Sequence, residues 1–101
     1  MSARARNRLI VSTRAQRDID GILLYTTERW GAYQRRRYQQ KLRGALRALK
    51  DHPERGVLRE EYYPGCRRLP VEHHLVYYHL DDENIVIDRV LHGSQDASSK
   101  F

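Results

Sequence analysis

The sequence predicts an α+β fold, with an N-terminal strand, an α-helical hairpin and then a three-stranded antiparallel meander. Two observations support this prediction. Apolar residues recur at a helical period between residues 13 and 50. After residue 65, β-branched and aromatic residues instead gather in short runs, and a polar turn separates the last two runs. Because 101 residues suit one small core, we expect a single domain over residues 1–101, with 94–101 as a flexible tail.

The first strand is predicted at Arg6–Val11, where Asn7, Leu9 and Val11 would share one face and the other face would be mixed. A helix should follow, because Ser12 and Thr13 offer capping hydroxyls and Thr13 with Gln16 fits a capping box. Gly21 costs this helix about 1 kcal/mol relative to alanine, so we expect close packing against a neighbour at that point. The apolar stripe of the helix consists of Ala15, Ile19, Ile22, Leu23 and Trp30.

A second helix is predicted almost at once after Gly31, which can adopt the left-handed conformation that ends the first. Its apolar stripe consists of Tyr38, Leu42, Ala45, Leu46 and Leu49. Its opposite, solvated side carries Arg36, Gln40, Arg43, Arg47 and Lys50. The helix should end at His52-Pro53, because proline lacks the backbone N–H and disfavours helical geometry at the residue before it.

The remainder is predicted as a loop over Glu54–Gly65 and strands at Cys66–Val71, His73–Leu80 and Asn84–Leu91. The residues Asp81-Asp82-Glu83 form the turn between the last two strands. We expect the helical hairpin to cover one face of the sheet and to leave the other face open.

Strict alternation along the last strand divides its residues between two faces. One face would hold Ile85, Ile87, Arg89 and Leu91, and the other Val86, Asp88, Val90 and His92. The pattern leaves open which of these faces meets the helices.

The composition, with 40% hydrophobic residues and a mean hydropathy of −0.83, is that of a folded globular chain. We expect no membrane segment, no secretory signal and a cytoplasmic location. Residues 1–50 carry 13 cations and 3 anions, whereas residues 51–101 carry 6 and 10. The basic half indicates either an anionic partner, which is nucleic acid or an acidic protein segment, or simply a solvated face.

No metal site or cofactor is predicted. Neighbouring His73 and His74 point to opposite sides of a strand, and a single cysteine supports neither an internal disulfide nor a cysteine-based metal site. Cys66 lies beside Arg67 and Arg68, which favour a reactive thiolate, although a half-buried strand residue is the simpler interpretation.

Basic and aromatic residues cluster in the strand region, namely Arg67, Arg68, His73, His74, Tyr77, Tyr78, Arg89 and His92. Such a set can serve a metal-free ribonuclease or a protein contact. For the two tyrosines, packing with a solvated hydroxyl is the alternative.

Several segments, in this order and at these separations, support a family resemblance. They include Leu9-Ile10-Val11-Ser12, Asp18-Ile19, Glu28-Arg29-Trp30-Gly31, His52-Pro53, Pro64-Gly65-Cys66-Arg67-Arg68-Leu69-Pro70, His74-Leu75-Val76-Tyr77-Tyr78 and Arg89-Val90-Leu91-His92. With them, the chain resembles the RelE/ParE superfamily of toxins from type II toxin–antitoxin systems, and most closely its ParE branch. The resemblance runs from end to end.

The resemblance implies a toxin without enzymatic activity that inhibits DNA gyrase and is neutralised by a ParD-like antitoxin. Neither a cofactor nor direct sequence-specific DNA binding is expected of it. Candidate antitoxin contacts are Ile22, Tyr25, Trp30, Arg36, Arg43 and Arg47. Candidate target contacts are Arg67, Arg68, Arg89 and His92. For Ile22 and Trp30, the alternative is an ordinary place in the core.

The sister branch suggests an alternative function, a RelE-like toxin that cleaves messenger RNA on the ribosome. Its catalytic residues here would be Arg67, His74, Arg89 and His92. However, His74 occupies the position where an arginine is expected, and neither arginine nor tyrosine follows His92. Two groups that would stabilise a phosphate in the transition state are therefore missing, which favours gyrase as the target. A decayed toxin that only sequesters antitoxin is a third hypothesis.

Overall fold

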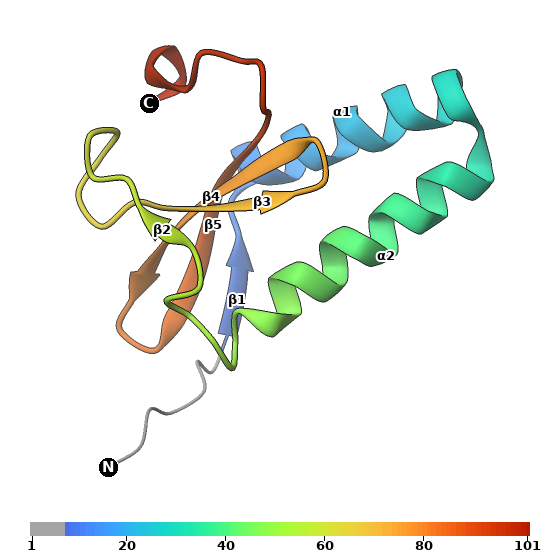
Figure 1. Ribbon diagram of the computed structural model, residues 1–101. Helices are drawn as coiled ribbons and strands as arrows, with labels where there is room; N and C mark the ends of the chain where they lie inside the picture. Colours follow the sequence, from blue (N-terminus) through green and yellow to red (C-terminus); the bar gives the residue numbers. More distant parts are fainter. Residues whose placement is uncertain (1–7) are drawn as a thin grey trace.

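The computed structural model describes residues 8–101, which form two helices and a five-stranded mixed sheet (Figure 1). The elements are β1 (Arg8–Val11), α1 (Thr13–Trp30), α2 (Ala32–Ala48), β2 (Val57–Leu58), β3 (Arg67–Val71), β4 (His74–Asp81), β5 (Asn84–His92) and a short 3₁₀ helix, η1 (Ala97–Lys100). The α+β class and the predicted order of strand, helical hairpin and antiparallel meander are confirmed. Arg6 and Asn7 of the predicted first strand lie outside the described residues.

The strand order in the sheet is β1-β5-β4-β3-β2. Strand β1 pairs in parallel with β5, and the other neighbours pair antiparallel. The prediction of an uninterrupted loop at Glu54–Gly65 is wrong, because Val57 and Leu58 pair with Arg68 and Arg67. Two residues are too few to show a strand period, so only the pairing with β3 identifies β2.

Helix α1 is capped by one of the two predicted hydroxyls, but without the predicted capping box. Ser12 is the N-cap, and its Oγ accepts a hydrogen bond from the Ala15 N–H at 3.0 Å. Gln16 bonds to Asp20 instead of returning to Thr13, so the predicted capping box is wrong. At the other end, Gly31 has a φ of 93° and donates its N–H to the Thr27 carbonyl, which confirms its predicted role.

The main core lies between the helical hairpin and the sheet. The buried residues of α2 are Tyr38, Leu42 and Leu46, and the following Leu49 is fully buried, so the predicted stripe is confirmed. From α1, Ala15 and Leu23 are buried, and Ile19 and Ile22 are partly buried. Trp30 is 65% exposed, so both its place in the predicted apolar stripe and the interpretation of it as a core residue are wrong.

A β-bulge interrupts the alternation in β5. Tyr78 pairs with Ile87 and Tyr77 pairs with Arg89, which leaves Asp88 as the extra residue. Ile85, Ile87 and Val90 therefore all belong to the main core. The strict alternation predicted for this strand fails at the bulge, because one inserted residue exchanges the two faces beyond it.

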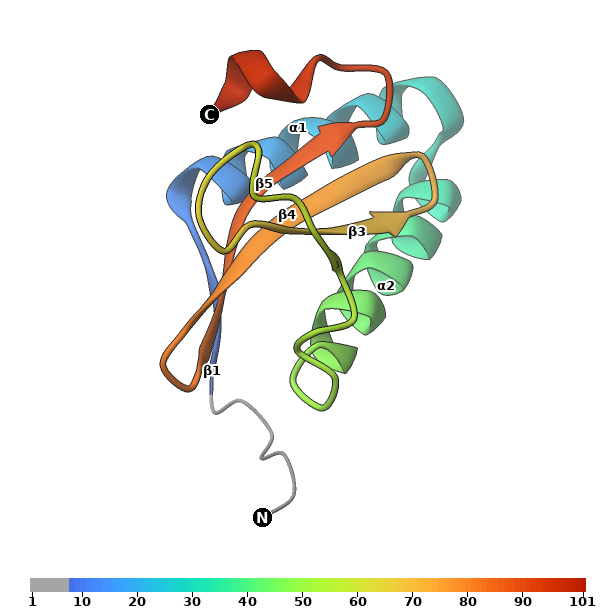
Figure 2. The same cartoon turned by 60° about the vertical axis from the view of Figure 1, so that its left-hand side comes forward.

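The second face of the sheet is covered, contrary to the prediction that it is open. Cys66, Tyr77, Leu91 and Ala97 form a small second core there, which Tyr62, Tyr63 and Leu75 extend. The C-terminal segment folds back beside the loop before β3, on the side away from the helices (Figure 2). Its last residue, Phe101, packs at tilted angles against the rings of Tyr62, Tyr63 and Tyr77.

The burial of Cys66 shows whether its thiol is reactive. Its side chain is fully buried, and this burial raises the pKa of the thiol. The structure therefore places it as a packing residue, and a reactive thiolate at this position is contradicted.

Within residues 8–101, no helix combines the length and apolar character needed to cross a membrane.

Candidate protein-binding groove

A groove of about 730 Å³ lies between the helical hairpin and the sheet, at the end where β4 begins and β5 ends. Helix α1 and the first turns of α2 supply one wall. The β3–β4 turn, the start of β4 and residues 89–92 supply the other. The hairpin tip extends beyond the sheet (Figure 1), and Trp30 at this tip still lines the groove.

The wall of the groove formed by α1 consists of residues that share one face of the helix. Asp18, Gly21, Ile22 and Tyr25 occupy positions i, i+3, i+4 and i+7, so they share one face, and all four line the groove. A Cβ at Gly21 would meet nothing within 4 Å, so the predicted close packing is wrong. The missing side chain instead keeps this part of the wall open.

Exposed aromatic residues lie at the tip of the helical hairpin. Tyr25 is 60% exposed and Trp30 is 65% exposed, and both line the groove. Tyr33, at the start of α2, is 73% exposed but lies outside the groove lining. Large aromatic side chains that remain this exposed are typical of protein interfaces, where they supply much of the contact area.

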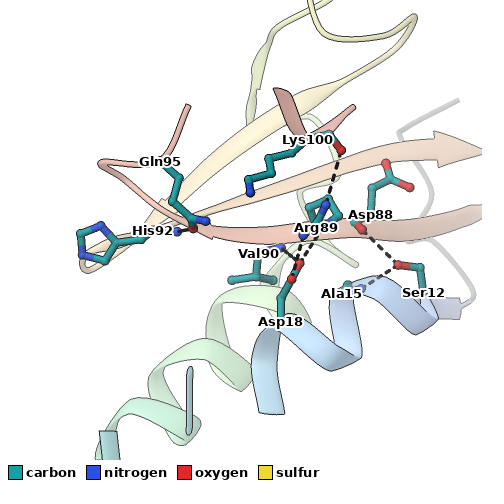
Figure 3. A network of polar contacts seen from close by, with 9 residues as sticks. All are labelled: Ser12, Ala15, Asp18, Asp88, Arg89, Val90, His92, Gln95 and Lys100. Carbon is teal, nitrogen blue, oxygen red and sulfur yellow. Dashed lines mark hydrogen bonds and ion pairs between the residues drawn. The ribbon is translucent and has the colours of Figure 1, made fainter. Parts of the chain in front are cut away.

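An ion pair joins α1 to the sheet on the floor of the groove (Figure 3). The Arg89 Nε and Nη2 donate to the two Asp18 carboxylate oxygens at 2.8 and 3.0 Å. Asp18 also accepts the Val90 backbone N–H at 2.9 Å, on the edge of β5 beyond the end of β1. Arg89 additionally donates to the Lys100 carbonyl at 3.4 Å. Hydrogen bonding to Asp18 raises the pKa of Arg89. This arginine therefore stays charged, and Asp18 fixes the position of its guanidinium group.

Histidine and tyrosine side chains meet at the opposite end of the floor. A hydrogen bond of 2.9 Å joins the Tyr38 Oη to the His74 Nδ1, and the His74 ring meets the His92 ring edge to face at 5.4 Å. Burial, with His92 and His73 adding to it, lowers the pKa of His74. Burial and the Glu72 charge raise the pKa of Tyr38 to about 12. Both groups are therefore neutral at pH 7.

The β3–β4 turn is tied to α2 at the rim of the groove. Arg37 donates to both Glu72 carboxylate oxygens at 3.3 and 3.2 Å, and the Lys41 Nζ lies 3.7 Å from Glu72 Oε2. The hydrogen bond from Arg37 lowers the pKa of Glu72. This contact is exposed, so it positions the turn and adds little stability.

The structure brings together only part of the residue sets predicted from the sequence. Among the candidate antitoxin, target and catalytic residues, six line the groove, namely Ile22, Tyr25, Trp30, His74, Arg89 and His92. Arg36, Arg43 and Arg47 are exposed on α2 and lie outside its lining. Arg67 and Arg68 also lie outside it, on β3.

Arg67 has a structural role at the far end of the sheet. Its Nη1 donates to the backbone carbonyls of Glu54 at 3.2 Å and Gly56 at 2.8 Å. It pairs with Tyr78, four residues along β4 from His74, which is about 13 Å at the usual rise of a strand. The four residues of the ribonuclease hypothesis thus do not converge on one point.

Asp18, Gly21, Arg37 and Glu72 belong to the groove, although the sequence did not mark them as site residues. The helical spacing of Asp18 and Gly21 with Ile22 and Tyr25 is a signal that indicates their shared face. For Arg37 and Glu72 there is no local signal, because they are 35 residues apart and only the fold brings them together.

A second polar cluster lies outside the groove, in a shallow pocket of about 430 Å³. Asp88, the bulged residue, accepts a hydrogen bond from the Tyr63 hydroxyl and lies 2.8 Å from the His79 Nδ1. Burial, with the bond to Asp88, strongly raises the pKa of Tyr63. The cluster ties the loop before β3 to the sheet.

Comparisons with known proteins agree on one kind of relative. The family model described as the ParE toxin of the type II toxin–antitoxin system parDE matches residues 9–97. Toxin ParE1 from Caulobacter vibrioides is 34% identical over 87 residues, which cover 86% of this chain and 90% of the relative. Toxin ParE1 from Mycobacterium tuberculosis is 31% identical over 92 residues, or 90% of this chain and 94% of the relative.

A solved structure shares the fold. It is a chain from the chromosomal ParDE toxin–antitoxin system of P. aeruginosa, with a TM-score of 0.74 and 20% sequence identity. The match covers 86% of this chain and 96% of that one.

Proposed function

Because the chain belongs to the ParE toxin family of type II toxin–antitoxin systems, we propose that it inhibits DNA gyrase in the cytoplasm and is neutralised by a ParD-like antitoxin. The observation that supports this most is the family match over residues 9–97, which includes the hairpin, the groove and all of the sheet except Arg8. The chain is thus a toxin of such a system, and gyrase and the antitoxin type are the proposal.

The groove is the proposed antitoxin-binding site. Ile22, Tyr25 and Trp30 offer apolar and aromatic surface along one wall, and two of the three are more than half exposed. Covering such surface supplies the binding free energy of a typical interface, with the polar rim adding specificity. Arg17 and Arg37 at the edges of the groove suit acidic antitoxin side chains.

The four candidate gyrase contacts differ in how firmly contacts within the chain already hold their side chains. Arg67 and Arg89 are held by backbone carbonyls and by Asp18 respectively. Within the described part of the chain, Arg68 has no ion pair, and the His92 ring is hydrogen-bonded to Ser94, only two residues away. We therefore propose Arg68 and His92 as the target contacts, with Arg67 and Arg89 maintaining the fold.

Controlled expression in a bacterial host tests the target class. The proposal predicts filamentous cells with DNA-damage signalling and intact bulk messenger RNA, all suppressed by co-expression of the antitoxin. Rapid loss of messenger RNA with intact chromosomes would instead support the ribonuclease alternative. Strong antitoxin binding without growth arrest would support a decayed toxin.

A further inference from the structure

The outer face of α2 carries several exposed basic residues. Helix α2 contains six cations and no acidic residue, even in its first turn, where the helix dipole favours negative charge. Arg37 and Lys41 are turned to Glu72 at the groove rim. Arg36, Arg43 and Arg47 remain exposed on the side opposite the buried stripe of Tyr38, Leu42 and Leu46.

We propose that this outer basic face of α2, defined by Arg36, Gln40, Arg43 and Arg47, docks on the phosphate backbone of duplex DNA. The antitoxin groove lies on a different side of the hairpin, so this inference goes beyond the proposed function. The proposed contact does not depend on the DNA sequence, because no side chain is assigned to a base edge.

The charges on this face lack acidic partners among the residues that the structure describes. Among residues 8–101, no ion pair involves Arg36, Arg43 or Arg47. Arg43 and Arg47 are four positions apart, a spacing at which like charges destabilise a helix by about 0.2–0.5 kcal/mol. A phosphate placed between two such guanidinium groups would remove this repulsion, and the planar fork of arginine suits phosphate oxygens.

The surface chemistry favours a phosphate backbone over an acidic polypeptide. Large aromatic side chains are among the main anchors of polypeptide interfaces. From Arg35 to Ala48, the exposed residues of α2 include no large hydrophobic side chain. Gly44 is exposed, and a Cβ there would meet nothing within 4 Å, so a flat approach is unobstructed. Binding to DNA needs no such anchors, because release of counterions from the phosphates supplies the affinity.

The length of the face also suits a duplex. Arg36 and Arg47 are separated by 11 residues, which is about 16 Å at the rise of an α-helix. The major groove of B-DNA is about 12 Å wide. A helix that crosses it can therefore place an arginine near the phosphates on each side.

Fluorescence anisotropy with the full-length chain and a short labelled duplex tests the proposal. We expect binding that is equal for two unrelated DNA sequences and that weakens steeply between 50 and 200 mM salt. The double variant Arg43→Gln/Arg47→Gln should bind about tenfold more weakly at low salt, with a salt slope reduced by about two. It should fold at least as stably as the parent, because it removes a like-charge pair.

The matched control is Arg8→Gln/Arg14→Gln, which removes the same charge from exposed positions on β1 and at the start of α1. We expect it to retain most of the DNA affinity. An equal loss in both variants, or no binding by the parent at 50 mM salt, would overturn the proposal. So would a variant that keeps DNA binding but loses binding to poly-L-glutamate, since the face would then serve an acidic polypeptide. Gyrase and antitoxin are absent from this assay, so its result is independent of the proposed function.

Discussion

Tyr78 is a buried residue whose hydroxyl fixes a turn some 20 residues away in the chain. Its ring lies in the main core, and its hydroxyl accepts the Gly56 N–H at 2.8 Å and donates to the Pro53 carbonyl at 2.9 Å. Arg67 binds the Gly56 carbonyl on the other side. The sequence predicted ring packing correctly, but the hydroxyl is satisfied by backbone groups and is not solvated.

This contact predicts a strong effect of a small change at Gly56. A Cβ there would lie 2.6 Å from the Tyr78 Cε1 and 2.7 Å from its hydroxyl oxygen. Because the Tyr78 ring is fully buried, it has no room to move aside. We expect Gly56→Ala to lower the free energy of unfolding by about 1–3 kcal/mol in urea titrations.

The matched control is Gly44→Ala, which makes the same chemical change in an open part of α2. It should raise the free energy of unfolding by about 0.5–1 kcal/mol, because alanine is the better helix residue. Equal effects of the two substitutions would contradict the described contact at Gly56.

His74 predicts a dependence of stability on pH. Its lowered pKa means that the folded protein binds fewer protons at this group than the unfolded chain does. The unfolded state therefore gains stability as the pH falls below about 6.5, towards the lower pKa of the folded state. We expect the free energy of unfolding to fall between pH 7.5 and 5.5, and to fall less in His74→Gln.

The control for this effect is His52→Gln, at an exposed position beyond α2. It should keep the pH dependence of the parent protein. The account of His74 fails if both variants show the same change between the two pH values. The pKa of Glu72 is lowered from an ordinary value of 4.5, so its titration lies below this window.

At the scale of the elements, the long periodic segments were predictable and the short or irregular ones were not. The two helices follow from their apolar stripes, and each of strands β3, β4 and β5 was predicted to within one residue at either end. Strand β2 and the bulge at Asp88 were missed. Both depend on the neighbouring strand, since pairing registers do not appear in a local pattern.

The groove was predicted on one side only. Ile22, Tyr25 and Trp30 share a helix, so their spacing placed them together. The Asp18–Arg89 pair spans 71 residues and the Arg37–Glu72 pair spans 35, so neither follows from spacing along the chain. Arg67 was predicted as a target contact, but the turn that it holds is visible only in the fold.

Trp30 allows a test of the groove at the tip of the hairpin. Because its side chain is 65% exposed, Trp30→Ala should change the free energy of unfolding by less than about 0.5 kcal/mol. As an aromatic anchor of the proposed interface, it should weaken antitoxin binding by about tenfold or more in calorimetric titrations.

Tyr33→Ala serves as the control, because Tyr33 is equally exposed at the same tip but lies outside the groove lining. Antitoxin affinity should change little in this variant. If Tyr33→Ala weakened antitoxin binding as much as Trp30→Ala, the antitoxin would contact the hairpin tip as a whole, and the groove would not be its specific binding site.

At the scale of the whole molecule, the C-terminal segment completes the second face of the sheet. Phe101 packs against three tyrosine rings at ring-centre distances of 5.0 to 5.7 Å, and Arg89 donates to the Lys100 carbonyl. Phe101→Ala should therefore lower the free energy of unfolding by about 1–2 kcal/mol. If residues 94–101 instead behave as a flexible tail, the loss will be below about 0.3 kcal/mol in the same urea titration.

Three surfaces of the molecule carry the proposals, and His92 belongs to two of them because it also lines the groove. The groove between hairpin and sheet is the proposed antitoxin-binding site, the outer face of α2 is the proposed phosphate surface, and Arg68 and His92 are the proposed gyrase contacts. A gyrase complex holds both protein and DNA, so a toxin that contacts both would use the last two surfaces together.

The most direct test of the central claim is a plasmid cleavage assay with purified gyrase and ATP, in which this protein is added alone or with its antitoxin. The account predicts linear or nicked DNA after treatment with detergent and protease, and suppression of this product by the antitoxin. Untouched plasmid in the presence of a toxin that still binds its antitoxin tightly would contradict it.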